Sequence, residues 1–209
     1  TDIRIMDSSE FKVSKKVADI FLGYLGEGRE ASVQIQFEYQ LLDSKVTEIS
    51  IGSPRDSDST EGMKNIEKVP ANTLLLRDLG YYSPKVFKEL SSKRIYFISR
   101  AKSQWNFYTL KDGEYSLLST ASIISLLKEK KEKYLDMEVY VGEKARTKVR
   151  LVANLLTEEQ KQTRLKKKSE NRKLGTDALE AIGINLFVTN VEPEKCTASQ
   201  VYDLYTLRW

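Results

Sequence analysis

The chain has 209 residues, enough to bury a sizeable core in one large domain or in one domain with an insertion. Its 34 Lys and Arg residues exceed its 30 Asp and Glu residues only slightly, so net charge alone does not indicate nucleic acid. The absence of histidine excludes Ser-His and Cys-His nucleophilic pairs and most zinc sites. Any metal must therefore be held by oxygen ligands, which favour magnesium, manganese or calcium.

Cysteine content and hydropathy indicate the compartment. The single cysteine, Cys196, excludes an internal disulfide and fits a reducing, cytoplasmic environment. No apolar stretch is long enough to span a bilayer, and the first ten residues do not form a signal peptide. We expect no membrane partner. Because the chain starts at Thr1 without Met, we expect it to be a piece of a longer protein.

The N-terminal quarter predicts three strands. A short apolar segment at residues 3–6 runs into Asp7 and predicts a strand that ends in a carboxylate. Residues 11–26 predict a loop with one or two helical turns. Residues 33–41 alternate strictly between apolar and polar side chains, which is typical of a half-exposed strand, and residues 46–51 return as its hairpin partner.

A short apolar run at residues 73–76 predicts a strand buried in the middle of a sheet, because it is apolar on both faces. Asp78 follows this strand. Ser83 and Pro84 form an N-cap and first-turn pair that predicts a helix over residues 84–90. Open α/β sheets place ligand chemistry at the carboxyl edge of their strands, so Asp78 is a candidate functional residue. A solvated turn aspartate is the ordinary alternative.

The other elements are read from periodicity, turn signals and caps. Thr157 with Gln160, and Thr197 with Gln200, predict two helix N-termini. Asp56 and Asp58 suit metal ligation, but turn and N-cap roles are commoner for aspartates in a serine-rich loop. The remaining predicted strands are residues 95–99, 104–110, 114–118, 135–141, 147–155 and 184–189, and the remaining helices are residues 62–68, 120–134, 157–173 and 197 onward.

A basic segment lies in the second half of the chain. Residues 161–173 contain seven Lys or Arg residues and one acid, Glu170. A solvated helix face is the usual explanation of such a run, and a phosphate backbone is the functional one. The candidate DNA contacts in this segment are Lys166, Lys167 and Lys168.

Five segments together resemble the DDE transposases of insertion sequences. They are IMDSS, LLLRDLGYY, YFISRAK, VRLVANLL, and LFVTN followed by VYDLYTLRW, in the family's order and approximate spacing over nearly the whole chain. The group resembled is insertion-sequence four, with its signature Tyr-x-x-Arg-x-x-x-Glu-x6-Lys. Here Tyr205 and Arg208 open that signature, and its Glu and Lys would fall beyond Trp209.

The resemblance implies an α/β, RNase H-like mixed sheet flanked by helices, with a mostly β insertion before the last catalytic helix. Residues 1–99 would be the first part of this core and residues 100–156 the insertion. Residues 157–209 would hold the basic helix, the last core strand and a truncated catalytic helix. We expect this chain to fold and bind DNA yet to cleave poorly, because the third carboxylate would be missing.

The implied activity is DNA transposition by metal-dependent phosphoryl transfer, which cuts transposon ends and joins the freed 3′-OH to target DNA. Asp7 and Asp78 would be the first two catalytic carboxylates and metal ligands, with two Mg²⁺ (or Mn²⁺) ions in the complete enzyme. Double-stranded DNA would be the partner, in the bacterial nucleoid, and a homodimer on DNA is compatible with the resemblance. An RNase H-like nuclease that only hydrolyses, or a decayed fragment that binds DNA without catalysis, are the alternatives.

Physical chemistry supports a cation between the two aspartates. Catalytic metal pairs lie about 3.5–4 Å apart and need several carboxylates. Two carboxylates brought this close repel each other in a partly dry site unless a cation lies between them. Asp7 and Asp78 are therefore expected to lie side by side on adjacent strands and to share metal.

Further residues are candidates for DNA contacts. Arg208 suits a DNA phosphate as a bidentate donor, with Tyr205 beside it on the same helix face. Arg100 and Lys102 follow a predicted strand on the same side as the site and suit the phosphate backbone. Trp105 suits stacking on a displaced base, although a hairpin tryptophan is more often part of the core.

Overall fold

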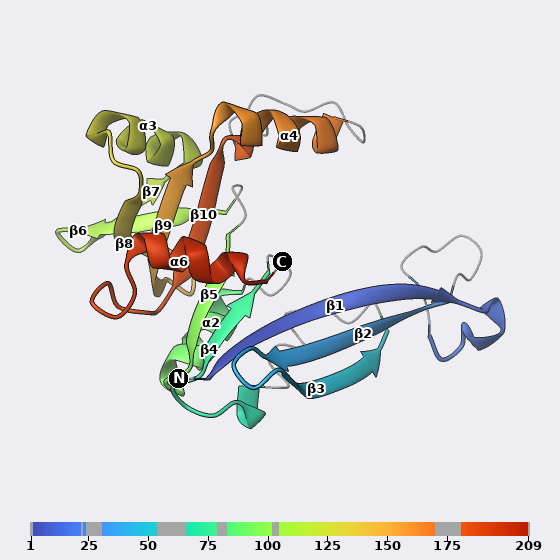
Figure 1. The fold of residues 1–209 in the computed structure, drawn as a ribbon. Helices are drawn as coiled ribbons and strands as arrows, with labels where there is room; N and C mark the ends of the chain where they lie inside the picture. Colours follow the sequence, from blue (N-terminus) through green and yellow to red (C-terminus); the bar gives the residue numbers. More distant parts are fainter. Residues whose placement is uncertain are drawn as a thin grey trace. The chain divides into compact units, whose positions relative to one another are not determined.

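The computed structural model describes residues 2–21, 23, 31–53, 66–78, 83–101, 105–169 and 181–208. The chain divides into two compact units, of which the first comprises Thr1–Phe97 and Arg208. The second comprises Ile98–Leu207 and Trp209, so the division falls within strand β5 (Tyr96–Arg100). Figure 1 shows the elements coloured along the sequence.

Four strands make up most of the first unit's sheet, in the order β3-β2-β1-β4. Strand β2 pairs antiparallel with both β1 and β3, whereas β4 is parallel to β1. Antiparallel and parallel pairs in one sheet, together with the helices described below, confirm the predicted mixed α/β fold. The strands are β1 (Ile3–Val13), β2 (Ala31–Gln40), β3 (Lys45–Gly52) and β4 (Leu74–Arg77), with β1 and β2 drawn side by side in Figure 1.

The first strand is longer than predicted. It was expected to end at Met6, but β1 continues to Val13, and Asp7 lies within it. The reason is its partner, because β2 pairs with β1 along its length, from Arg4↔Gln40 to Val13↔Ala31. This ladder keeps polar residues in the strand that would otherwise favour a turn. The loop expected from residue 11 therefore starts only at Ser14, before a short 3-10 helix, η1 (Lys15–Val17).

The predicted β2–β3 hairpin is confirmed, but its burial is the reverse of the usual pattern. In β2 the polar side chains of Gln36 and Glu38 are buried, each residue only 3% exposed. In β3 the apolar Ile49 and Ile51 are 62% and 65% exposed. The alternation thus indicated a strand correctly, but it did not indicate which face is buried.

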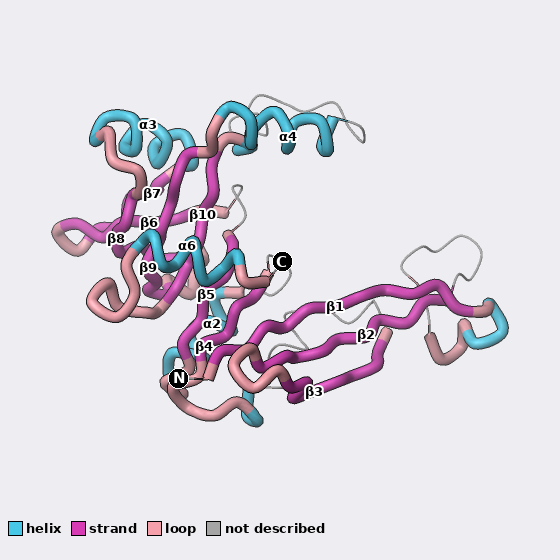
Figure 2. Tube along the Cα trace, in the orientation of Figure 1, coloured by secondary structure: helices cyan, strands magenta, loops and turns pink. Residues whose placement is uncertain are grey.

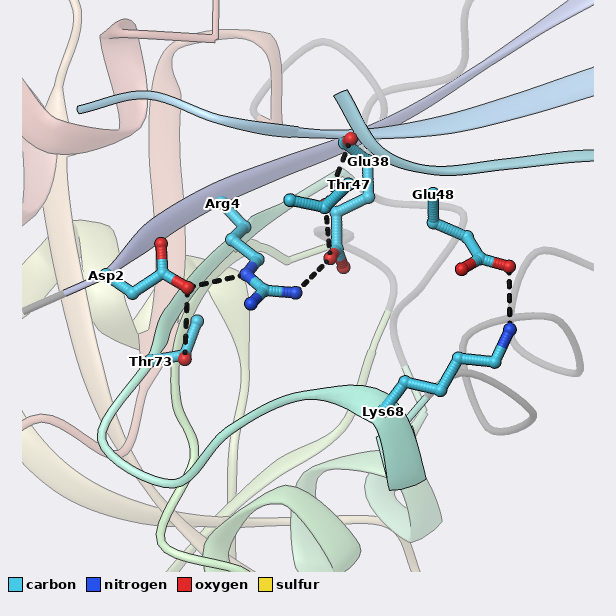
Figure 3. Close-up of polar contacts among 7 residues, drawn as sticks. All are labelled: Asp2, Arg4, Glu38, Thr47, Glu48, Lys68 and Thr73. Carbon is cyan, nitrogen blue, oxygen red and sulfur yellow. Dashed lines mark hydrogen bonds and ion pairs between the residues drawn. The ribbon is translucent and has the colours of Figure 1, made fainter. Parts of the chain in front are cut away.

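A polar network accounts for the buried acid on the hairpin (Figure 3). The guanidinium of Arg4 donates from Nε to Asp2 Oδ2 (2.6 Å) and from Nη1 to Glu38 Oε1 (2.8 Å). The hydroxyl of Thr47 also donates to Glu38 (2.9 Å), and that of Thr73 donates to Asp2 (3.5 Å). Burial opposes the charge of Arg4, but the hydrogen bonds to Glu38 and Asp2 outweigh burial and raise its pKa. The network joins β1 to β2, β3 and the residue before β4.

The central strand and the helix after it match the predictions. All four residues of β4 are buried, and Asp78 follows directly. Helix α2 (Pro84–Ser92) begins after an extended Ser83 with Pro84 in its first turn, although the Ser83 side chain makes no capping bond. Phe87 on the buried face of α2 stacks on Phe97, with ring centroids 4.3 Å apart. The described part of the predicted helix at residues 62–68 is a 3-10 turn, η2 (Ile66–Lys68).

The second unit contains the end of β5 and five further strands in the order β5-β10-β9-β8-β6-β7 (Figure 2). Strand β10 pairs antiparallel with β5 and β9, and all six of its residues are buried. The strands are β6 (Phe107–Lys111), β7 (Glu114–Leu118), β8 (Leu135–Val141), β9 (Thr147–Leu155) and β10 (Ile184–Thr189). The described helices of this unit are α3 (Thr120–Lys130), α4 (Glu158–Ser169) and α6 (Ala198–Thr206). Residues 181–182 are helical as well.

Local signals in this unit were reliable guides. Strands β8, β9 and β10 have the predicted bounds, and Asp112 (φ 52°) and Gly113 (φ 86°) form the tight turn of the β6–β7 hairpin. Both predicted capping boxes are formed, at α4 and at α6. Helix α3 ends four residues before the predicted end, because Lys131 adopts a left-handed conformation (φ 53°).

Arg150 on β9 has a structural role that the sequence pattern did not reveal. Its guanidinium binds both carboxylate oxygens of Asp136 on β8, at 2.7 and 2.6 Å. Its Nη1 also donates to the backbone carbonyls of Val191 and Cys196, at 3.0 and 2.7 Å. These four bonds hold the segment before α6 against the sheet of the second unit.

Candidate active site

The register between β1 and β4 determines where the two candidate aspartates lie. The parallel pairs are Ile3↔Leu74, Arg4↔Leu75 and Ile5↔Leu76. Continued by two residues, this register brings Asp7 of β1 level with Asp78, the residue that follows β4 in the first unit. The two carboxylates therefore approach each other because of strand pairing, although β1 extends beyond Asp7 and β4 ends before Asp78.

A guanidinium contacts both carboxylates. Arg208, which belongs to the same unit, places Nη2 at 3.4 Å from Asp7 Oδ1 and Nη1 at 3.5 Å from Asp78 Oδ1. Its side chain is 1% exposed, whereas those of Asp7 and Asp78 are 47% and 38% exposed. Both contacts are longer than a strong charge-assisted hydrogen bond, which spans about 2.7–2.9 Å. The cation that the aspartate pair requires is thus supplied here by the protein itself.

The predicted relation between Tyr205 and Arg208 is wrong in its geometry. They were expected to share one helix face, but α6 ends at Thr206, and Leu207 is the C-cap. Arg208 therefore lies beyond the helix. The Tyr205 side chain is buried in the second unit, with its ring centroid 5.0 Å from that of Phe187. Arg208 was predicted to meet a DNA phosphate, and here it faces the carboxylates instead.

The residues at this pair fit a hard divalent cation in type. Asp7 and Asp78 offer oxygen donors, the kind that Mg²⁺ and Mn²⁺ prefer, and both side chains are accessible to solvent. One oxygen, Asp7 Oδ1, also accepts the backbone N–H of Ser8 at 3.0 Å. Among the described residues, no group of three or more Asp, Glu, His or Cys side chains gathers at any site. Within the described ranges, two carboxylates and no third acid therefore gather here.

The other candidate residues lie in different places. Arg100 ends β5, is partly buried, and lines a cavity of about 530 Å³ together with Arg164 of α4. Trp105 is partly exposed before β6, and Lys166 is exposed on α4. Outside the described part of the chain are Lys102, the side chains of Lys167 and Lys168, and Asp56 and Asp58.

Comparison with known proteins identifies the family. The family model described as "Transposase DDE domain" matches residues 1–209. The chain belongs to this family. The transposase for insertion sequence element IS231F of Bacillus thuringiensis subsp. israelensis is 32% identical over 99% of the chain and 47% of its own length. The transposase for IS1151 of Clostridium perfringens is 30% identical, over 98% of the chain and 47% of its own length. This chain thus spans about half the length of the curated relatives that it matches.

Solved structures similar to this DDE transposase domain include the piggyBac transposase synaptic complex with hairpin DNA. That likeness has 10% sequence identity and a TM-score of 0.47, and it covers 99% of this chain and 37% of the other. A second is Ciona intestinalis endonuclease V in complex with DNA, with 13% identity, a TM-score of 0.37, and coverage of 97% and 75%. Among the helices in the described ranges, none is long and apolar enough to cross a membrane.

Sequence reasoning missed two features of the DDE domain. The contacts of Arg208 with Asp7 and Asp78 had no local signal, because 201 positions separate Arg208 from Asp7. The position of Arg164 was also missed. It was counted in the basic run of residues 161–173, but its half-buried place beside β10 was not predicted. A helical wheel of α4 could have indicated that Arg164 and Leu165 face inward.

Proposed function

We propose that this domain is the catalytic core of a DNA transposase of the insertion-sequence-four group. Its reaction would be metal-dependent phosphoryl transfer, which cuts transposon ends and joins the 3′-OH to target DNA. The observation that carries the proposal is the meeting of Asp7 and Asp78 at one guanidinium, with both carboxylates partly exposed. Membership of the DDE transposase family supports the same reaction.

Asp7 and Asp78 are the proposed catalytic carboxylates and metal ligands. Two Mg²⁺ or Mn²⁺ ions, when bound, would activate the attacking oxygen and stabilise the leaving oxygen. The protein's own contribution is position, because the paired strands β1 and β4 hold the two side chains level with each other. The Arg4 network lies on the same strand, three residues before Asp7, and fixes β1 against its neighbours.

Arg208 is proposed to exchange partners. Its two terminal nitrogens contact Oδ1 of Asp7 and Oδ1 of Asp78, which are ligand atoms for a divalent cation. A cation bound by these oxygens would weaken both contacts, because it competes for the same charge. The released guanidinium has a planar fork that matches a phosphate. Arg208 would thus serve as a counter-ion before metal binds and as a phosphate ligand afterwards.

The wider assignments belong to the same proposal. The partner is double-stranded DNA, at transposon ends and at the target, in the bacterial nucleoid, and a homodimer on that DNA is compatible with the proposal. Residues 100–156 correspond to the mostly β insertion, between the core segments 1–99 and 157–209. Tyr205, Arg100, Lys102, Trp105, Lys166, Lys167 and Lys168 remain candidate DNA contacts.

Metal binding tests the proposal without requiring catalysis. We expect Mn²⁺, titrated into the 209-residue chain, to bind at least about tenfold more weakly to Asp7→Asn and to Asp78→Asn, because ligand charge sets the affinity of such sites. Glu10→Gln is the matched control, since Glu10 is an exposed acid on the same strand. Unchanged Mn²⁺ affinity in both Asn variants would exclude these residues as metal ligands.

Catalysis is then tested in a transposase that contains this domain. Cleavage of transposon-end DNA and joining of the 3′-OH to a second duplex should both be lost in Asp78→Ala. Cleavage without joining would identify a hydrolytic nuclease instead. DNA binding without any cleavage by the unmutated protein would identify a binding protein derived from a transposase.

A further inference from the structure

A cavity of about 530 Å³ is lined by residues of the second unit, whereas Asp7 and Asp78 belong to the first. Its walls come from α4, β10 and α6, which Figure 1 labels, and from the end of β5. Two arginines line it, Arg100 from β5 and Arg164 from α4. The aromatic side of the wall includes Phe187 and Tyr202, whose rings meet edge to face at 6.1 Å.

Strand pairing and hydrogen bonds explain why both arginines reach this cavity. Arg100 is directly opposite Phe187 in the antiparallel β5–β10 ladder, so the two side chains lie on the same face of the sheet. Asn185, two residues along β10, lies on that face too. Arg164 is held there by donating from Nη2 to Asn185 Oδ1 (2.5 Å) and from Nη1 to the carbonyl of Ile184 (3.3 Å).

Two arginines but one acid, Glu159, stand among the described residues that line the cavity. Both acceptors of Arg164 are neutral, and no ion pair to Arg100 or Arg164 forms within the described ranges, although Glu159 lines the same cavity. Burial, and then the charge of Arg100, lower the pKa of Arg164 below its usual value. Arg100 and Arg164 thus line one cavity with like charges, and an anion bound there would relieve their repulsion.

The size and surroundings of the cavity indicate the kind of anion. A space of about 530 Å³ accommodates a nucleotide-sized group, and guanidinium groups bind phosphate through parallel hydrogen bonds. Helix α4 continues from Arg164 to Lys166, whose side chain is exposed, so the helix carries a further positive charge two residues beyond Arg164. Several positive charges suit a polymeric phosphate backbone better than a single free phosphate.

We propose that Arg100 and Arg164 form a binding site for a backbone phosphate of DNA, in addition to the site at Asp7 and Asp78. The identity of the polyanion rests on the proposed function, whereas the presence of a phosphate site does not. Arg164 is thereby assigned a role in phosphate binding. Its place in a basic run was also compatible with a solvated helix face.

The first test measures duplex DNA binding by fluorescence anisotropy in EDTA, over a range of salt concentrations, with the 209-residue chain. Arg100→Gln and Arg164→Gln should each lower the slope of log K against log salt by up to about 0.9, the value for one neutralised phosphate. The double variant should lower this slope by less than the sum of the two single effects if both side chains bind the same phosphate. Lys144→Gln, an exposed charge in the same unit, is the control and should leave the slope unchanged. Equal effects of the control and the arginine variants would overturn the proposal.

A second variant separates phosphate binding from a structural role of Arg164. Arg164→Lys keeps the positive charge but loses the fork that binds Asn185 and Ile184. If the charge binds phosphate, Arg164→Lys should retain most of the salt slope that Arg164→Gln loses. Equal loss in the two variants, with matching falls in Tm, would show that Arg164 only supports the fold and would overturn the proposal.

Titration with inorganic phosphate and pyrophosphate distinguishes a failure of this inference from a failure of the proposed function. Stabilisation of the wild-type chain by pyrophosphate that disappears in Arg164→Gln, without any binding of duplex DNA, would support an anion site and contradict the proposed function. DNA binding by the wild type that is unaffected in all arginine variants would leave the proposed function intact and overturn the phosphate site.

Discussion

Arg208 Nη2 lies 3.4 Å from Oδ1 of Asp7, a residue 201 positions earlier in the chain. The same guanidinium lies 3.5 Å from Oδ1 of Asp78, so it balances the charges of two carboxylates that paired strands bring together. The contact links the end of the described chain to its first strand. The positive guanidinium also reduces the repulsion between the two carboxylates when no metal is bound.

Replacing Arg208 should therefore make the fold more dependent on metal. In EDTA, we expect Arg208→Gln to lower the free energy of unfolding by about 1 kcal/mol, a modest cost because both carboxylates are partly exposed to water. Added Mg²⁺ should raise the Tm of Arg208→Gln more than that of the wild type, since the guanidinium no longer competes. Lys85→Gln, an exposed charge on α2, is the control for thermal unfolding. An equal Mg²⁺ shift in all three proteins would contradict this role.

The ion pair between Arg4 and Glu38 should be more important for stability than a surface pair. Both side chains are largely buried, and removing one partner leaves the other charged and desolvated. We expect Arg4→Met or Glu38→Gln alone to cost about 3 kcal/mol in urea unfolding, and the double variant to cost less than the sum. Lys68→Met, which breaks the exposed pair with Glu48 seen in Figure 3, should cost under about 1 kcal/mol. Strict additivity of the two buried substitutions would contradict direct coupling.

The basic segment of α4 should contribute to DNA affinity, and this contribution should weaken as the salt concentration rises. Replacing Lys166, Lys167 and Lys168 together by Gln should lower the salt slope of duplex binding by up to about 0.9 for each phosphate that these side chains neutralise. The matched control removes three charges at the end of α3, at Lys128, Lys130 and Lys131, which are all exposed. A slope that changes equally in both triple variants would mean that the α4 segment is an ordinary solvated face.

Cys196 gives a prediction about alkaline pH. Burial raises the pKa of its thiol above the ordinary value of 9.0, and its Sγ lies 3.8 Å from the carbonyl of Thr197. The thiol of Cys196 holds its proton more tightly in the folded chain than in the unfolded chain. Its protonated form therefore contributes fully to stability below the unfolded pKa, and this contribution is lost as pH rises toward the folded pKa. The difference in unfolding free energy between wild type and Cys196→Ala should therefore shrink above about pH 9, by at most about 1.4 kcal/mol per pH unit. A difference that stays constant from pH 7 to 10 would contradict the raised pKa.

Reactivity of the same thiol offers an independent check. The native chain should react slowly with an alkylating reagent at pH 8, because little thiolate is present and the residue is buried. Urea should increase the rate to that of an unfolded peptide. Fast alkylation of the folded chain would show that Cys196 is more accessible than its packing indicates.

Local features of the sequence determined much of the fold. The bounds of β8, β9 and β10 followed from their apolar patterns, and the β6–β7 turn followed from Asp112 and Gly113. Capping residues placed the starts of α4 and α6. Each of these signals acts over a few residues, through backbone conformation or a neighbouring hydrogen bond, so it can be read without knowing the fold. The order of motifs along the chain likewise carried the family resemblance.

Long-range contacts decided the rest. Strand β1 runs to Val13 only because β2 is there to pair with it, and Ile49 and Ile51 face outward because Glu38 is held inside by Arg4. Arg208 meets Asp7 and Asp78 because α6 ends at Thr206, so Arg208 lies beyond the helix and belongs to the first unit. A sequence records which residues carry charge, but the free energy of a charge depends on what surrounds it, and only the tertiary structure brings those partners together.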